Sequence, residues 1–289
     1  MYESKNILIP ARPGAEETTL HIKIVTEKAD YLTTRPYIFI LPGGPGANHS
    51  HYKDYECLQD SANIVFYDPR GCGLSAKGTP DSYTMDNYIQ DLDIIRQQLG
   101  LQEIQLLGKS YGAMCALGYA IRFPKNVTRM VLAAGSPSFR NLDSAKAHLE
   151  VHANAEQKAA YETVFNGTIK NQAEMDHYFA VMAPYYSYKK RNNIPTARPL
   201  AEYPFSFEPL NTGFKSFLRH FDYEPLLSSI QCKTLVLVGD EDWITSKLHS
   251  IKIADNIPDA KLIIFEHSDH SMEDDVPELF FGEIRRFIE

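Results

Sequence analysis

The chain has 289 residues, of which 44% are hydrophobic and 23% charged, a composition typical of a folded globular protein that excludes disorder, collagen and coiled coil. Its 37 acidic and 29 basic residues give a net charge of −8, which argues against nucleic acid or an anionic membrane as a partner. No apolar run approaches the roughly 20 residues of a membrane helix, and the first residues lack the pattern of a signal peptide, so we expect a cytoplasmic protein.

The first part of the chain shows three strand-like segments and one helix. Residues 20–25 alternate apolar and polar, as in a half-buried strand. Segments 37–41 and 63–67 are continuous apolar runs, typical of strands that are buried on both faces. Apolar residues at steps of three and four over 84–99 predict a helix, and Gly100 follows as its stop.

The same alternation continues through residue 133. A strand at 104–107, a tight turn at 108–112, a helix at 113–122 and a strand at 130–133 follow one another. Strands that alternate with helices are typical of an α/β protein with a mostly parallel sheet, helices on both faces and right-handed crossovers.

The alternation stops after Gly135 and resumes with a strand at 234–238, a helix at 246–255, a strand at 262–265 and a last helix at 277–288. We therefore expect one α/β domain formed by residues 1–135 and 222–289, interrupted by an inserted, mainly helical cap at 136–221. The inserted segment is rich in aromatic residues, which predicts either its own small core or an aromatic lid over a site, or both.

The strongest local motif lies in the tight turn. Residues 108–112 read Gly-Lys-Ser-Tyr-Gly, a G-x-S-x-G between a predicted strand and a predicted helix. Glycines are needed there because side chains next to so sharp a turn would crowd the serine. A phosphate-binding loop would need a glycine five positions before Gly108, where the chain has Glu103, so we exclude a nucleotide site.

A serine nucleophile needs a base and a carboxylate that orients the base. Asp240 and Asp242 follow the strand at 234–238, and His267 and His270 follow the strand at 262–265. The order Ser, Asp, His is that of an α/β-hydrolase, with all three residues at one edge of the sheet. Spacing from the strand ends favours Asp242 and His270, so Ser110, Asp242 and His270 are the predicted catalytic residues.

An oxyanion hole is the third requirement of this chemistry. Residues 41–46 read Leu-Pro-Gly-Gly-Pro-Gly directly after a buried strand, and such a loop can present backbone N–H groups without obstruction by side chains. We predict that the N–H groups of Gly44 and Tyr111 form the hole.

Metal and cofactor sites are not expected. The four cysteines lack CxxC spacing, so we predict neither a disulfide framework nor a zinc site. His148 and His152 are four residues apart like two zinc ligands, but Glu150 does not follow the first histidine directly and no third ligand is evident.

With these residues in place, the chain resembles the prolyl aminopeptidase (proline iminopeptidase) family of α/β-hydrolases, peptidase family S33. The family's HGGPG motif is similar to Pro42-Gly43-Gly44-Pro45-Gly46, and its D-x-R-G-x-G-x-S motif to Asp68-Pro69-Arg70-Gly71-Cys72-Gly73-Leu74-Ser75. Its G-x-S-x-G motif is similar to Gly108–Gly112, and its G-x-x-D motif to Gly239–Asp242. Its SGH motif and the PE pair that follows are similar to Ser268-Asp269-His270 and Pro277-Glu278. The resemblance implies the same catalytic and oxyanion roles.

The family removes N-terminal residues, often proline, from short peptides, and carboxylates of its cap hold the free amino group. The resemblance therefore makes Glu202, Glu208 and Glu224 candidate substrate contacts, together with Trp243, which follows Asp242 where some relatives place a glutamate. Pro42 also replaces the family's usual histidine, and Tyr111 stands where tryptophan is common.

The leading hypothesis is a cytoplasmic serine hydrolase that releases N-terminal residues, proline or small and apolar ones, from short peptides through an acyl-enzyme. An esterase, lactonase or other amide hydrolase with the same triad is the alternative, and a non-catalytic binding protein on the same fold is a third possibility. The expected partner is a small molecule or short peptide, with no metal, organic cofactor, nucleic acid or membrane.

Overall fold

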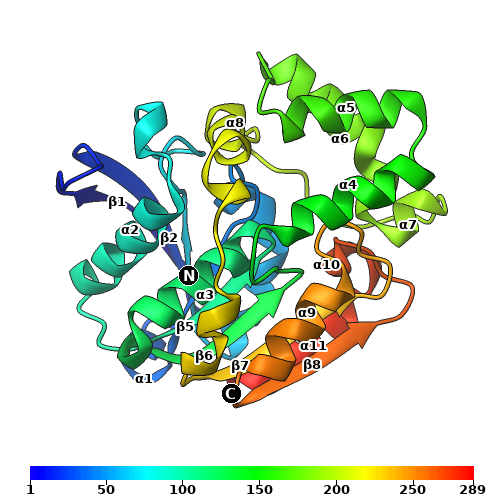
Figure 1. Ribbon diagram of the computed structural model, residues 1–289. Coiled ribbons are helices and arrows are strands. Elements are labelled where there is room, and N and C mark those ends of the chain that lie inside the picture. The colour runs from blue at the N-terminus through cyan, green and yellow to red at the C-terminus, as the bar shows by residue number, and fades with distance from the viewer.

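A central eight-stranded sheet organises the protein, which is described over residues 1–289 by a computed structural model (Figure 1). The spatial order is β1-β2-β4-β3-β5-β6-β7-β8. The strands are β1 (Tyr2–Ile9), β2 (Thr18–Val25), β3 (Tyr37–Leu41), β4 (Asn63–Tyr67), β5 (Ile104–Lys109), β6 (Val127–Ala133), β7 (Lys233–Gly239) and β8 (Ala260–Phe265).

The sheet is parallel from β4 through β8, whereas β1 and β2 add an antiparallel edge. In an open sheet of this kind, ligands bind outside the carboxyl ends of the parallel strands. The loops that follow β3, β5, β7 and β8 therefore meet at one edge. The expectation of a mostly parallel sheet is confirmed.

Helices cover both faces of the sheet and bury a separate apolar core on each. Helices α2 (Met85–Gln98), α3 (Tyr111–Arg122) and α9 (Lys247–Asn256) pack on one face. The opposite face is covered by the 3-10 segment η1 (His49–Asp60) and by helix α11 (Pro277–Ile288). Side chains of β3 alternate between the two cores, because successive residues of a strand point to opposite faces.

Five helices lie between β6 and β7, above the carboxyl edge of the sheet in Figure 1. They enclose a third core that includes Leu149, Tyr161, Met175 and Trp243. We define residues 192–206, which contain no helix until α8 begins, as the strap. The helices are α4 (Arg140–His152), α5 (Ala155–Phe165), α6 (Gln172–Tyr186), α7 (Tyr188–Arg191) and α8 (Phe207–Lys215).

The helices of this protein are either too short or too polar to span a membrane. The remaining elements are short. The elements are α1 (Tyr31–Thr34), α10 (Met272–Asp275) and the 3-10 segments η2 (Pro80–Ser82), η3 (Pro124–Asn126), η4 (Phe217–Arg219) and η5 (Glu224–Ser229).

Candidate active site

Ser110 lies between the last residue of β5 and the first residue of α3, in a strained backbone conformation with φ 55° and ψ −118°. The flanking glycines make this turn possible. A Cβ on Gly108 would lie 2.6 Å from the Cα of Ala113, and one on Gly112 would lie 2.6 Å from the carbonyl carbon of Leu41. The strand therefore turns into the helix with the serine projecting from the carboxyl edge.

The Nδ1 atom of His270 lies 2.9 Å from Oδ2 of Asp242, and both side chains are buried. The other carboxylate oxygen, Oδ1, accepts hydrogen bonds from the backbone N–H groups of Ile244 and Thr245, at 2.9 and 3.0 Å. Burial by itself would raise the Asp242 pKa, but His270 and the hydrogen bond from Thr245 lower it to about 2. The carboxylate is therefore ionised and holds the imidazole through Nδ1, which leaves Nε2 for chemistry.

The two alternatives of the sequence pattern lie elsewhere. Asp240 accepts a hydrogen bond from the backbone N–H of Ser268 at 3.2 Å and so supports the loop. His267 is exposed and packs against the ring of Tyr188, with 5.2 Å between the ring centroids. The geometry therefore pairs Asp242 with His270.

The glycine loop after β3 lies directly against the serine. A Cβ on Gly43 would be 3.2 Å from the Cβ of Ser110. The Gly43 N–H donates to the Tyr52 hydroxyl at 2.7 Å, whereas the Gly44 N–H has no acceptor within the protein. Tyr111 is the first residue of α3, so its N–H has no acceptor inside the helix. Both N–H groups are therefore free to donate, which the prediction of an oxyanion hole requires.

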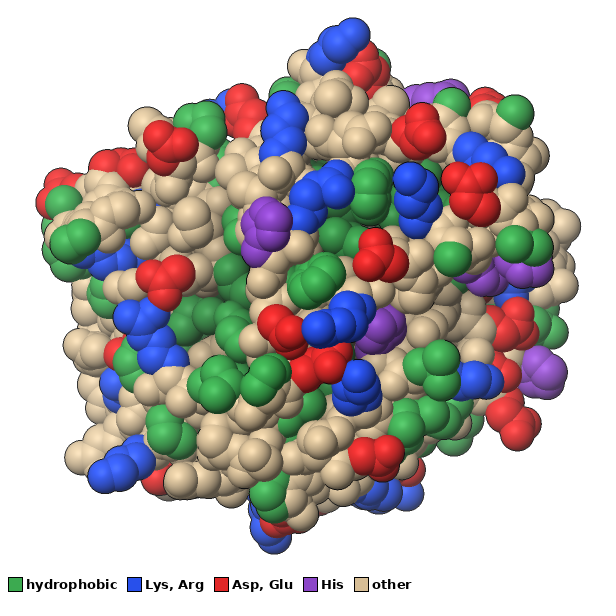
Figure 2. Space-filling view, in the orientation of Figure 1, with side chains coloured by type: hydrophobic (Ala, Val, Ile, Leu, Met, Phe, Trp, Pro, Cys, Tyr) green, Lys and Arg blue, Asp and Glu red, His purple; other side chains and the backbone are tan.

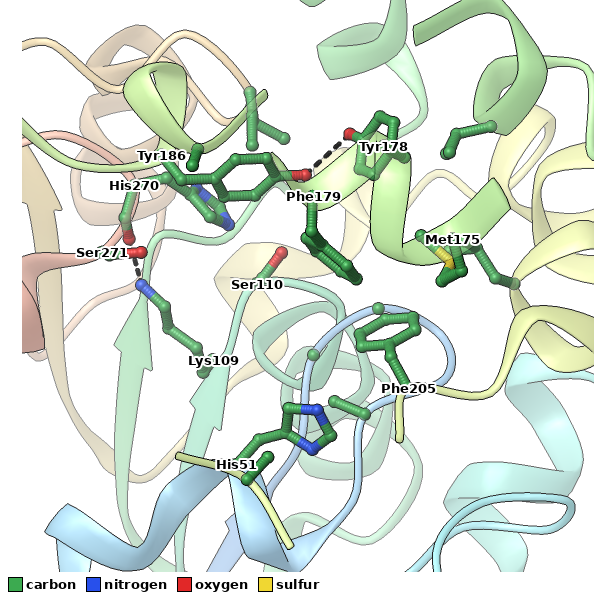
Figure 3. A pocket seen from close by; sticks show the side chains of 18 of the residues that line it. His51, Lys109, Ser110, Met175, Tyr178, Phe179, Tyr186, Phe205, His270 and Ser271 are labelled. Atoms are coloured by element: carbon green, nitrogen blue, oxygen red, sulfur yellow. Dashed lines mark hydrogen bonds between the residues drawn. The ribbon is translucent and has the colours of Figure 1, made fainter. Parts of the chain in front are cut away.

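A cavity of about 910 Å³ opens over Ser110, and it is lined by Gly43, Gly44 and His270 as well as by the inserted helices and the strap. Figure 3 shows the Ser110 hydroxyl pointing into this space, near the rings of Tyr186 and His270. These two rings meet edge to face at 5.8 Å. Ser110, the predicted nucleophile, and His270 therefore line the same cavity.

The four candidate substrate contacts separate into two pairs. Glu202 and Trp243 line the cavity. Glu208 pairs instead with Lys77 at 3.5 Å, and Glu224 pairs with Lys252 at 2.9 Å and lies in η5. Neither of the latter two lines the cavity. Glu208 and Glu224 are thus placed as ion-pair residues outside the pocket.

The pocket also contains charged residues that the motif analysis missed. Lys109 is buried beside Ser110, its Nζ donates to the backbone carbonyl of His270, and it lies 3.2 Å from Oε2 of Glu273. Glu273 also accepts a hydrogen bond from Arg198 of the strap at 3.1 Å. Burial by itself would raise the Glu273 pKa, but Lys109 and Arg198 lower it. The only sequence signal for this charged group was a lysine inside the G-x-S-x-G motif. No sequence pattern marked Arg198.

We expect Lys109→Met to lower kcat by about tenfold or more with little change in KM, because the backbone of His270 loses a donor that ties it to the strand carrying Ser110. Steady-state kinetics would measure both constants. Because Lys109→Met leaves the buried Glu273 carboxylate without its lysine partner, the double variant with Glu273→Gln removes that unpaired charge. Lys109→Arg retains a positive charge and should keep part of the wild-type kcat. A wild-type kcat in the double variant, or an equal loss in the surface variant Lys261→Met, would contradict this role.

Comparisons with known proteins identify the fold family and relatives of this chain. Residues 36–275 match the family model described as alpha/beta hydrolase fold. A proline iminopeptidase of Pestalotiopsis fici, PfmaB, is 31% identical over 261 residues, which cover 88% of this chain and 92% of the relative.

Solved structures show the same fold at lower identity. The proline iminopeptidase of Mycobacterium smegmatis superposes with a TM-score of 0.72 at 20% identity, over 98% of this chain and 97% of that one. An esterase of Exiguobacterium antarcticum superposes with a TM-score of 0.67 at 19% identity, over 98% of this chain and 99% of that one. The two structures have the overall fold in common with this chain.

Proposed function

This chain belongs to the proline iminopeptidase family of α/β-hydrolases, and we propose that it is a serine aminopeptidase that releases N-terminal residues from short peptides through an acyl-enzyme. The observation that carries the proposal is the buried Asp242–His270 pair at the carboxyl edge that also bears the strained Ser110. The proline iminopeptidase relatives, one of which covers 88% of the chain, support the peptidase activity.

In the proposed reaction, the Ser110 oxygen attacks the scissile carbonyl while Nε2 of His270 takes the hydroxyl proton. The Gly44 and Tyr111 N–H groups stabilise the oxyanion, and each such donor typically contributes about 2.7 to 4 kcal/mol to the transition state. His270 then gives its proton to the leaving amine as the C–N bond breaks. Water, activated by His270, attacks the ester and releases the N-terminal residue and Ser110.

Asp242 keeps the imidazole oriented and stabilises its protonated form during each transfer. The fixed Nδ1 contact of 2.9 Å determines that Nε2 faces the substrate. Because the carboxylate pKa is about 2, Asp242 stays ionised across the neutral range and accepts no proton in this scheme.

We assign substrate contacts to Glu202 and Trp243, the two candidates that line the cavity. Glu202 is exposed and pairs with Lys53 at 3.2 Å, so a substrate ammonium group would compete with a surface lysine for it. Because exposed ion pairs contribute little to stability, replacement of Lys53 by a substrate ammonium group would cost little free energy.

We also propose that the enzyme works in the cytoplasm on small substrates. All four cysteines are unpaired, which suits a reducing compartment. Acidic and basic side chains are interspersed on the face drawn in Figure 2, with no continuous basic patch of the kind that nucleic acid requires.

An esterase or amidase that recognises an apolar acyl group is the second candidate. The observation that favours it is the cavity lining, in which hydrophobic side chains predominate. Such an enzyme would use the same nucleophile but would not need a free amino group on the substrate.

A substrate series separates the two candidates. We expect alanine and proline amides with a free amino group to be cleaved about 10 to 100 times more efficiently than their N-acetylated forms, because a charge-assisted contact contributes about 1.5–3 kcal/mol. Fluorescent leaving groups would report kcat/KM. Glu202→Gln should reduce this ratio without slowing cleavage of a simple acyl ester. Equal rates with free and blocked amines would refute the aminopeptidase proposal in favour of the esterase.

A further inference from the structure

We propose that the enzyme prefers substrates whose N-terminal residue has a bulky apolar side chain, such as phenylalanine or leucine, over those that begin with proline or alanine. The preference rests on the proposed aminopeptidase function and names its substrate class. It follows from the size of the cavity, from where its apolar end lies relative to His270, and from the pairing of its charged residues.

The cavity is larger than one small residue requires. Its volume of about 910 Å³ lies near the upper end of the roughly 300–1,000 Å³ found for sites that enclose drug-sized ligands. Apolar side chains from α3, α4, α5, α6, α8 and η4 converge on it. They include Met114, Leu142, Val164, Met175, Leu210 and Leu218.

The direction of the reaction identifies which substrate group enters the apolar end. His270 must protonate the leaving amine, so the peptide beyond the scissile bond lies on the His270 side of Ser110. Figure 3 shows Met175, Phe179 and Phe205 on the other side of Ser110. The acyl part of the substrate, which is the N-terminal residue, therefore projects toward these side chains.

The rings of Phe179 and Phe205 contact each other edge to face, with 5.1 Å between their centroids. Aromatic side chains add favourable edge-to-face contacts when another ring packs against them. A phenylalanine side chain of the substrate would meet these two rings before it reaches Met175. A proline or alanine side chain has less hydrocarbon to bury against these rings and Met175.

Charged groups do not compete for this end of the cavity. The carboxylates that line the cavity are those of Asp176, Glu202 and Glu273. Glu273 is paired with Lys109 and Arg198, and Asp176 is exposed and accepts a hydrogen bond from Gln172 at 2.8 Å. Glu202 is exposed at the strap. A substrate side chain at the apolar end therefore gains from burial of hydrocarbon and meets no unpaired buried carboxylate.

The test uses the wild-type enzyme and fluorogenic amides of alanine, proline, leucine and phenylalanine with free amino groups. We expect kcat/KM for the phenylalanine amide to exceed that for the alanine amide by at least about tenfold, with leucine between them and proline near alanine. The common leaving group keeps the chemistry on the His270 side constant across the series.

Two variants that narrow the cavity from different helices locate the preference. Met175→Trp on α6 and Val164→Phe on α5 should each lower kcat/KM for the phenylalanine amide by about tenfold while leaving the alanine amide within about twofold. Ala180→Trp is the control, since Ala180 is an exposed residue of α6 that does not line the cavity. Two positions keep the test informative if one variant folds poorly.

The outcomes distinguish this preference from the proposed function. Equal kcat/KM for all four amides, or a preference for proline, overturns the preference and leaves the aminopeptidase function standing. A phenylalanine preference that both narrowing variants retain also overturns it. Failure to cleave any of the four amides, together with cleavage of acyl esters, overturns the aminopeptidase function and the preference with it.

Discussion

Ser110→Ala is expected to lower kcat by at least about 10⁴-fold while the protein stays folded. Removal of the nucleophile from a Ser-His-Asp site costs nearly as much as removal of the whole triad, because the three residues act as one unit. Turnover of the best fluorogenic amide would measure the loss. Labelling by an active-site phosphonate should disappear in the same variant.

The fold should survive this change because the Ser110 side chain supports no structure. Its hydroxyl makes no hydrogen bond within the protein and points into the cavity (Figure 3). The strained φ of 55° is already present in the wild type, and alanine meets it with a side chain of similar bulk at Cβ. Circular dichroism and a melting temperature within about 2 °C of wild type would show an intact fold.

Ser229→Ala provides the matched control, since Ser229 is exposed and its hydroxyl only donates to the backbone carbonyl of Leu226. That variant should keep wild-type turnover. Unchanged turnover in Ser110→Ala, in a preparation free of contaminating hydrolase, would end the assignment of Ser110 as the nucleophile.

The buried strands were predictable from local sequence because burial on both faces leaves a direct mark. The apolar runs at 37–41 and 63–67 coincide with β3 and β4, and the last helix occupies 277–288 as predicted. Strand β1 was not predicted. It is an edge strand that is exposed over most of its length, and Glu3, Ser4, Lys5 and Asn6 hide any apolar alternation.

The catalytic candidates could be predicted from the sequence because each of them follows a strand of the parallel sheet. Parallel strands end at one edge, so topology alone brings Ser110, Asp242 and His270 together. The charged group of Lys109, Glu273 and Arg198 could not be found in this way. Arg198 meets Glu273 across 75 residues of chain, and its position depends on the path of the strap, which has no periodic pattern.

Glu224 shows that sequence reasoning can also select a residue that lies outside the cavity. The family resemblance made this carboxylate, which lies just after the inserted segment, a candidate contact for the substrate's amino group. In the structure it accepts a hydrogen bond from Ser138 at 2.6 Å and pairs with Arg140 and Lys252 outside the cavity. Which carboxylate reaches a pocket is set by the tertiary path of irregular segments, and local composition does not specify that path.

Gly112→Ala is expected to prevent stable folding, the second large effect. A Cβ at this position would overlap the carbonyl oxygen of Leu41 and lie 2.6 Å from its carbonyl carbon. Both atoms belong to the backbone of β3, which is hydrogen-bonded between β4 and β5 and cannot shift without disrupting the sheet. Overpacking that only displaces side chains costs about 1–3 kcal/mol, and a backbone clash at the centre of the sheet should cost more.

Gly282→Ala is the control that separates this clash from the general effect of replacing a helical glycine. Gly282 lies within α11, and the nearest atom to its Cβ would be the end of the Arg286 side chain at 3.7 Å. Alanine there should stabilise the protein by about 0.5–1 kcal/mol, since glycine is the poorer helix former. Urea unfolding would measure the change in the free energy of unfolding, which should fall in Gly112→Ala and rise in Gly282→Ala.

The comparison also tests the geometry on which the catalytic assignment depends. Gly112 is needed because α3 begins directly against the end of β3, the strand that leads into the glycine loop. A Gly112→Ala protein that unfolds at the same urea concentration as wild type would mean that helix and strand lie farther apart. The proposed oxyanion hole of Gly44 and Tyr111 would then lose its geometric basis, even if the assignment of Ser110 as the nucleophile still held.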